Sequence, residues 1–292
     1  MESLSKIREK IRLPLNINVA SYLMDHGFQG KAVLPAVEAM GVLAASTLAH
    51  LPGRAVNCIR DARFDKFLPI KEAGRPIHAF NDLEVLDDGT AVSRLITKTK
   101  SKKAMITRTL EHAILCFQDF SKGPVPPSWE IPAGPVYPVS VETIYKNLVP
   151  FGPSYHNLKG RVAISEKGAM GQVNAPPLGG MSSPLGSPFP LDAAFHAACV
   201  WGQRYVGYVG FPVGFGLRWL FAPTRSGNTY TARIFPKKIH PDRFLADIWI
   251  TGMDGALQEG VLDVVMKDVS GGRVKPPSWI VKGVETKPLD LF

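Results

Sequence analysis

The chain has 292 residues, of which 45% are hydrophobic and 20% charged, as in a globular protein rather than a disordered or fibrous one. It carries 34 Lys and Arg against 25 Asp and Glu, so its formal net charge is +9. No apolar run reaches the roughly 18 residues that cross a bilayer, and Met1 to Arg12 lacks the apolar stretch of a signal peptide. We therefore expect a cytoplasmic protein whose charge suits either nucleic acid or another acidic partner.

The first half of the sequence predicts one helix followed by an antiparallel sheet. Ala36–Ala49 is a run of helix formers directly after Pro35. Apolar and β-branched residues then dominate four predicted strands, Ala55–Phe67, Ile77–Val85, Ala91–Thr99 and Ala104–Phe117. Asp88-Gly89 lies between two of these strands and is typical of a hairpin turn.

The middle of the chain predicts a linker. Residues 122–138 are rich in Pro and Gly, and proline lacks a backbone donor and restricts its neighbours, so neither a regular helix nor a central strand fits. A stiff, extended connector is the remaining interpretation. It divides the chain into an N-terminal unit, 1–121, and a C-terminal unit, 139–292.

The second half repeats the pattern of the first. A helix is predicted over Leu191–Tyr205, after a stretch from Asn174 to Pro190 that reads as a surface excursion. The predicted strands are Gly214–Ala222, Asn228–Phe235, Phe244–Thr251 and Leu257–Val265. One helix followed by an antiparallel meander, twice, predicts an α+β protein made of two similar units.

A polar constellation stands at the start of each predicted helix. His26 precedes a Gly-containing turn that leads into the first helix, and the free amides of a helix start favour developing negative charge. Asp192 and His196 are four residues apart, so they share one face of the second helix. A histidine from one unit and a carboxylate from the other are therefore placed to bracket a substrate.

These residues resemble the motifs of a known family. His26, Gly30 and Pro35 form H-x3-G-x4-P, which looks like the signature of the dehydratase domains of polyketide synthases and related fatty-acid and lipid synthases. Asp192-x3-His196 is similar to the family's second motif. Phe151-Gly152-Pro153 stands where the family carries Tyr-Gly-Pro, and Phe211-Pro212-Val213-Gly214-Phe215 resembles its proline-led strand.

The resemblance implies a double hot dog fold, in which each unit wraps an antiparallel sheet around a central helix. It implies dehydration of a 3-hydroxyacyl thioester on an acyl carrier protein to a trans-2-enoyl thioester. His26 would be the base and Asp192 the acid, which needs a pKa raised by burial. The Gly30 amide would stabilise charge on the thioester oxygen, and His196 would hold Asp192 or contact the leaving hydroxyl.

One departure from the family pattern keeps other functions open. Phe151 replaces the usual Tyr, so a hydroxyl that positions substrate is missing, with Tyr155 and His156 as candidates to compensate. The alternatives are a non-catalytic dehydratase-like module for structure or docking, and a double hot dog isomerase, product-template cyclase or thioesterase. We treat Phe151 as mainly structural or tunnel-lining.

We predict no cofactor and no metal, because the substrate would be carried on phosphopantetheine and the cysteines and histidines lack ligand spacing. The expected partners are an acyl carrier protein and other synthase domains, with no nucleic acid and no membrane; a homodimer stays open. Alternating Lys98, Lys100 and Lys102 suit either a charged strand edge or a carrier-protein docking surface. The alternating basic residues from Lys6 to Arg12 read as a solvated terminal segment.

Overall fold

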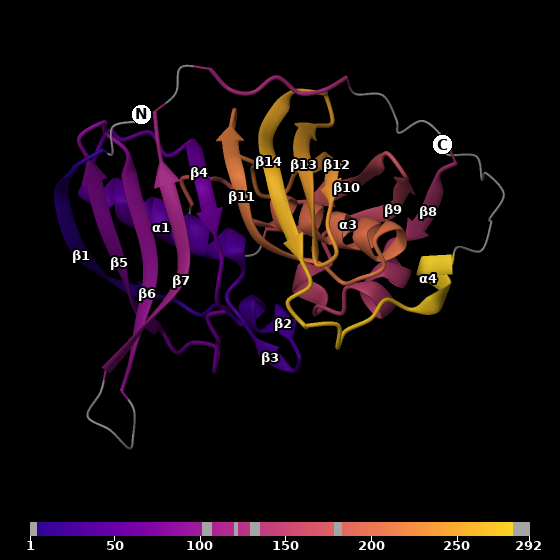
Figure 1. The fold of residues 1–292 in the computed structure, drawn as a ribbon, viewed down its shortest axis with the longest axis horizontal. Helices are drawn as coiled ribbons and strands as arrows, with labels where there is room; N and C mark the ends of the chain where they lie inside the picture. Colours follow the sequence, from indigo (N-terminus) through magenta and orange to yellow (C-terminus); the bar gives the residue numbers. More distant parts are fainter. Residues whose placement is uncertain (1–4, 101–106, 120–121, 129–134, 178–182, 283–292) are drawn as a thin grey trace.

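The two halves of the chain lie side by side, each with one long helix (Figure 1). The computed structural model describes residues 5–100, 107–119, 122–128, 135–177 and 183–282. In these residues no helix is both long and apolar enough to cross a membrane. The α+β class predicted from the sequence is confirmed.

One antiparallel sheet runs through both halves of the described chain. Its strands, in spatial order, are β1 (Ile7–Ile17), β5 (Ile77–Leu86), β6 (Ala91–Lys100), β7 (Thr107–Phe117), β4 (Cys58–Arg63), β11 (Phe211–Leu220), β14 (Leu257–Lys267), β13 (Arg243–Gly252), β12 (Thr229–Ile239), β10 (Gly168–Asn174), β9 (Leu158–Ser165) and β8 (Tyr137–Ser140). The β4–β11 pair joins the two halves. Outward from this pair, the strands follow the same relative chain order on both sides: β4, β7, β6, β5, β1 on one and β11, β14, β13, β12, β10 on the other. The sheet is therefore built twice from one plan.

Each half wraps its strands around one helix. Helix α1 (Ala36–His50) packs against β6 and β7, and α3 (Phe189–Tyr205) packs against β9, β10 and β12. Both helices begin at or next to a proline, as the sequence predicts, because proline fits a helix start and cannot continue one. Every residue of α3 from Phe189 to Gln203 is buried, so a polar side chain on this helix must find its partners inside the protein.

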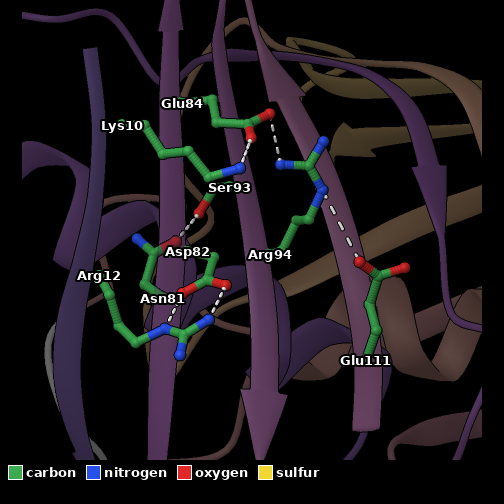
Figure 2. A network of polar contacts seen from close by, with 8 residues as sticks. All are labelled: Lys10, Arg12, Asn81, Asp82, Glu84, Ser93, Arg94 and Glu111. Atoms are coloured by element: carbon green, nitrogen blue, oxygen red, sulfur yellow. Dashed lines mark hydrogen bonds and ion pairs between the residues drawn. The ribbon is translucent and has the colours of Figure 1, made fainter. Parts of the chain in front are cut away.

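The basic amino-terminal segment is a paired strand at the edge of the sheet, and its basic residues, Lys6, Arg8, Lys10 and Arg12, are exposed to solvent as the sequence predicts. Figure 2 shows Lys10 and Arg12 on β1 reaching across to acidic residues of β5. Lys10 Nζ lies 2.7 Å from Glu84, and Arg12 donates two hydrogen bonds to Asp82. Such exposed pairs contribute little stability, but together with the β1–β5 ladder they hold the strand in register.

The lysines near residue 100 lie where the strand is paired on one side among the described strands. Strand β6 carries Lys98 and Lys100; its pairing with β5 ends at Ile96, and from Thr97 to Lys100 it pairs with β7 alone. This end of β6 is therefore an edge, as the charged-edge interpretation expects. The Lys98 ammonium lies 5.2 Å from the centre of the Phe80 ring, while Lys102 and Lys103 lie outside the described residues.

Two segments follow the N-terminal sheet before β9. The start of the predicted linker packs closely against β11, since a Cβ at Gly123 would lie 2.6 Å from Nε1 of Trp219. After β8 the chain forms a short helix, α2 (Val141–Thr143), a π-helical turn, η2 (Ile144–Leu148), and a 3-10 turn, η3 (Pro153–Tyr155). These turns, which the sequence reading did not predict, carry Tyr145 and bring Phe151 to the boundary between the halves.

Candidate active site

His26 is held by backbone on both sides of a small hairpin. It follows the 3-10 turn η1 (Ser21–Asp25) and precedes β2 (Gly27–Phe28) and β3 (Lys31–Ala32). Nδ1 of His26 lies 3.0 Å from the carbonyl oxygen of Val33, and the Val33 amide donates back to the His26 carbonyl at 2.9 Å. Because a carbonyl only accepts, Nδ1 carries the proton, and the Nε2 lone pair is free to act as a base.

Gly30 stands at the tip of this hairpin. Gln29 and Gly30 have φ angles of 50° and 75°, so the turn needs left-handed backbone, which glycine adopts at little cost. Strand β3 and Val33 separate Gly30 from the helix, so the turn does not lead directly into α1. Gly30 and Pro35 do not line the cavity beside His26, whereas Ala36, the first residue of α1, does.

Asp192 lies in the first turn of α3, facing His26 across the boundary between the halves. Its Oδ1 is 3.9 Å from Nε2 of His26, and its Oδ2 is 3.1 Å from Nε2 of His196, one helical turn along. Both Asp192 and His196 are buried. The structure thus brings together three of the predicted residues, from two elements far apart in sequence.

Tyr145, in η2, completes this cluster and was missed by the sequence reading. Its hydroxyl lies 3.4 Å from Nδ1 of His196 and accepts a hydrogen bond from the Leu158 amide at 2.9 Å. Because the Leu158 amide donates to the tyrosine oxygen, the hydroxyl proton of Tyr145 is available for Nδ1 of His196. No local motif marks this residue, because the turn that carries it is positioned only by the folded C-terminal half.

Phe151 and Gly152 fix the position of His26. The Phe151 ring stacks on the imidazole of His26 with centroids 4.4 Å apart and lies 5.0 Å from that of His196. The Gly152 amide donates to the Asp25 carbonyl at 2.8 Å, and the Ser154 amide donates to the Asp25 carboxylate. A Cβ at Gly152 would lie 2.5 Å from the Asp25 side chain, so only glycine allows this approach.

Neither candidate to replace the missing tyrosine hydroxyl lines the cavity. The Tyr155 ring lies 5.0 Å from that of His26, but its hydroxyl is buried without a hydrogen-bond partner in the described part of the chain. Burial raises the pKa of this phenol, which stays protonated. His156 lies within hydrogen-bond distance of the Phe151 carbonyl, 2.8 Å away, and stacks on Tyr145. Both residues support the walls of the site.

His26 and Asp192 line a cavity of about 900 Å³ whose wall consists mainly of apolar side chains. His26, Phe151, Asp192 and His196 all contribute to its wall. Buried His112 also lines it, but its Nε2 lies 2.8 Å from Thr97 Oγ1 and its Nδ1 3.2 Å from the Lys66 carbonyl, so no ring nitrogen is free for substrate. The described residues contain no cluster of three or more His, Cys, Asp or Glu suited to a metal ion.

The pKa values of His26 and Asp192 are both lowered, but by different causes. Burial lowers the pKa of His26, since removal from water outweighs the attraction of the Asp192 carboxylate, and the imidazole is neutral near pH 7. Burial also raises the pKa of Asp192, but the nearby imidazoles of His196 and His26 lower it further, leaving it below the usual aspartate value. This direction is opposite to the raised pKa that the sequence-based argument expects at Asp192.

No known protein-family profile matches the chain, and no curated protein sequence matches it. Solved structures do match. The dehydratase domain of a mycocerosic acid synthase-like polyketide synthase superimposes with a TM-score of 0.71 at 16% identity, covering 91% of this chain and 92% of that one. The dehydratase domain of the CurF module of the curacin polyketide synthase gives 0.69 at 15% identity, with 91% and 96% covered.

A dehydratase domain of a trans-AT polyketide synthase from Brevibacillus brevis gives a TM-score of 0.69 at 12% identity, again with 91% and 96% covered. At such low identity the likeness establishes the fold. The sheet repeats one strand order in its two halves, and each half encloses one helix. This is the double hot dog fold of polyketide synthase dehydratase domains, as the motifs predicted.

Proposed function

We propose that this chain removes water from a 3-hydroxyacyl thioester, carried on the phosphopantetheine of an acyl carrier protein, to give a trans-2-enoyl thioester. The observation that carries the proposal is the pair formed by Nε2 of His26 and the carboxylate of Asp192, 3.9 Å apart in one cavity. A neutral base beside a carboxylic acid is what elimination of water across adjacent carbons requires.

The first step is removal of the proton α to the thioester. His26 Nε2 takes this proton, because Nδ1 already donates to the Val33 carbonyl and holds the productive tautomer. The electron pair moves toward the thioester oxygen, where a free amide at the start of α1 offers stabilisation. Ala36 lines the cavity at that start, so we assign to its amide the role that the family resemblance implies for Gly30.

The second step is loss of the β-hydroxyl as water. The protonated carboxyl of Asp192, whose Oδ2 lies 3.1 Å from Nε2 of His196, gives its proton to the leaving oxygen. Because the pKa of Asp192 is lowered, this step uses the fraction of the protein in which this carboxyl holds a proton. The C–O bond breaks as the C=C bond forms, and His26 returns its proton across the 3.9 Å gap to Asp192.

Incubation with a 3-hydroxyacyl carrier protein, followed by mass spectrometry, tests this function. We expect loss of water from the acyl chain, and hydration of the enoyl product in reverse. Folded protein that catalyses neither direction over a range of chain lengths would contradict the proposal and favour a non-catalytic module.

The surroundings of this activity are part of the same proposal. A polyketide or fatty-acid synthase would supply the carrier protein and the neighbouring domains, in the cytoplasm. Within the chain, we propose that 1–121 and 139–292 are the two hot dog units and that 122–138, whose last two residues already belong to β8, links them.

A further inference from the structure

The chain is anchored to the sheet in the same way in front of each long helix. The Leu34 amide, directly before the proline that caps α1, donates to the carbonyl of Leu68, which follows β4, at 2.8 Å. The Ser187 amide, directly before the proline that caps α3, donates to the carbonyl of Thr224, which follows β11, at 2.9 Å. Since β4 and β11 pair with each other where the halves meet, the two anchors are equivalent positions of the repeated fold.

A second cavity, of about 240 Å³, is lined by the same kinds of element with the halves exchanged. The catalytic cavity takes its wall from the segments before α1 and after β4 and from α3, which carries Asp192. The second cavity takes its wall from the segments before α3 and after β11 and from α1, which carries Glu38. It is therefore the counterpart of the catalytic cavity in the repeated fold.

The second cavity contains a buried cation. Arg218, on β11, lines it and is 4% exposed. Its Nε donates to the carboxylate of Glu259 at 2.7 Å, and its Nη1 lies 4.0 Å from the sulfur of Met40. Within the described part of the chain, its Nη2 has no hydrogen-bond partner. Because leaving a buried donor without a hydrogen bond costs free energy, an acceptor in this cavity would be stabilised by Nη2.

The second cavity also contains an acid that readily holds a proton. Glu38 lines it, and its Oε1 accepts a hydrogen bond from the Tyr22 hydroxyl at 2.8 Å. Burial raises the pKa of this carboxyl. A protonated carboxyl donates a hydrogen bond to an anion and does not repel it. Among the described residues of the wall, Glu38 and Arg218 are the two that can carry a charge near neutral pH.

We propose that the second cavity binds a small monocarboxylate. The carboxylate accepts hydrogen bonds from Nη2 of Arg218 and from protonated Glu38, and a short aliphatic tail lies against the apolar residues of the wall, Val37, Leu185 and Phe189. The volume is below the range of about 300–1,000 Å³ of pockets for drug-sized ligands. An acid already offsets the charge of Arg218, so a doubly charged anion fits less well. This site goes beyond the proposed dehydration and does not depend on it.

Titration of the protein with propanoate, followed through its backbone amide NMR signals, tests the site. We expect saturable shifts at Glu38, Gly41 and Ser187, which line the cavity. Propanamide, a neutral molecule of nearly the same shape, should bind at least about tenfold more weakly, because hydrogen bonds between charged groups are the stronger ones. Shifts that do not saturate at these residues, or equal binding of propanamide, would overturn the proposal.

Removal of the buried ion pair tests the role of Arg218. Arg218→Met combined with Glu259→Gln takes away both charges, so neither is left buried without its partner. We expect propanoate to bind this variant about tenfold more weakly or less tightly still. The matched control is Arg12→Met combined with Asp82→Asn, which removes an ion pair between β1 and β5 outside the cavity wall and should leave binding unchanged.

Undiminished binding in the Arg218 and Glu259 variant, or an equal loss in the control, contradicts the assignment. If thermal melting shows that the buried pair is needed for folding, Ser187→Leu takes its place. This change fills the cavity and leaves the ion pair intact, so it should abolish the saturable shifts at Glu38 and Gly41. Propanoate binding that survives Ser187→Leu would place the ligand elsewhere and overturn the proposal. None of these readouts requires dehydratase activity.

Discussion

Each of the two long helices carries a carboxylic acid in its first turn, and the two acids have different surroundings. Glu38 on α1 accepts a hydrogen bond from the Tyr22 hydroxyl at 2.8 Å, and its pKa is raised, chiefly by burial. Asp192 on α3 lies between two imidazoles, and its pKa is lowered. Both acids lie in the first turn of their helix, so the difference between their pKa values comes from their neighbours.

The duplication of the fold shows how far the two helix starts have diverged. When Pro35 is aligned with Pro188, the residues that cap the two helices, Ala39 falls opposite Asp192 and Leu43 opposite His196. The N-terminal helix thus presents apolar side chains where the C-terminal helix presents the acid and its histidine. The two halves share a fold, but among the two aligned helix starts only that of α3 carries the acid–histidine pair.

The largest expected effect separates the two acids directly. Asp192→Asn removes the group that delivers the proton to the leaving hydroxyl, and we expect kcat to fall by about 10²–10⁴-fold. Glu38→Gln removes a carboxyl that does not line the cavity, so kcat should fall less than about tenfold, within the range of indirect effects. Dehydration kinetics measure both, and equal losses would show that the comparison of the two acids is mistaken.

A smaller effect is expected from the tyrosine beside each acid. Tyr145→Phe removes the hydroxyl near His196 and leaves the Leu158 amide unpaired, costing about 1–3 kcal/mol of stability. It should also change the pH dependence of kcat, because His196, the neighbour of Asp192, loses the hydroxyl that contacts its Nδ1. Tyr22→Phe should lower stability without changing that profile. Denaturant melts and pH–rate profiles distinguish the two, and an unaltered profile in Tyr145→Phe would remove its assigned role.

The smallest effect is a shift in the titration of His26. Burial lowers its pKa, so the folded imidazole should titrate below the ordinary value of about 6.5. The neutral base is then present above that folded pKa and is lost as the pH falls through it. Asp192→Asn removes a carboxylate that raises this pKa, so His26 should titrate lower still. Imidazole proton shifts in NMR report both values, and a His26 that titrates above 6.5 would contradict this electrostatic account.

The sequence predicted the repeated plan because proline starts, helix formers and alternating strands are local signals. His26 and Asp192 were identifiable because their motifs survive even though overall similarity to the solved dehydratase domains is low. Tyr145 was not, since only tertiary packing places it beside His196. The lowered pKa of Asp192 could not be predicted either, because it depends on the distances to the imidazoles of His196 and His26, and residue spacing does not give the distance to His26.

Strand β1 shows a different kind of limit. Its alternating basic residues matched a solvated segment as well as a strand, and the acidic partners that decide between them lie on β5, far along the chain. Gly30 shows a third limit, because the H-x3-G-x4-P motif does not reveal that β3 intervenes before the helix.

The central claim is that His26 and Asp192, from different halves of the chain, act on one substrate as a unit. A double-mutant cycle with His26→Ala, Asp192→Asn and the double variant tests it, with kcat for dehydration of a 3-hydroxyacyl pantetheine as the readout. We predict that the double variant loses about as much activity as either single variant, because residues that act together are strongly non-additive. Losses that multiply would mean that the two groups act independently and would contradict the account.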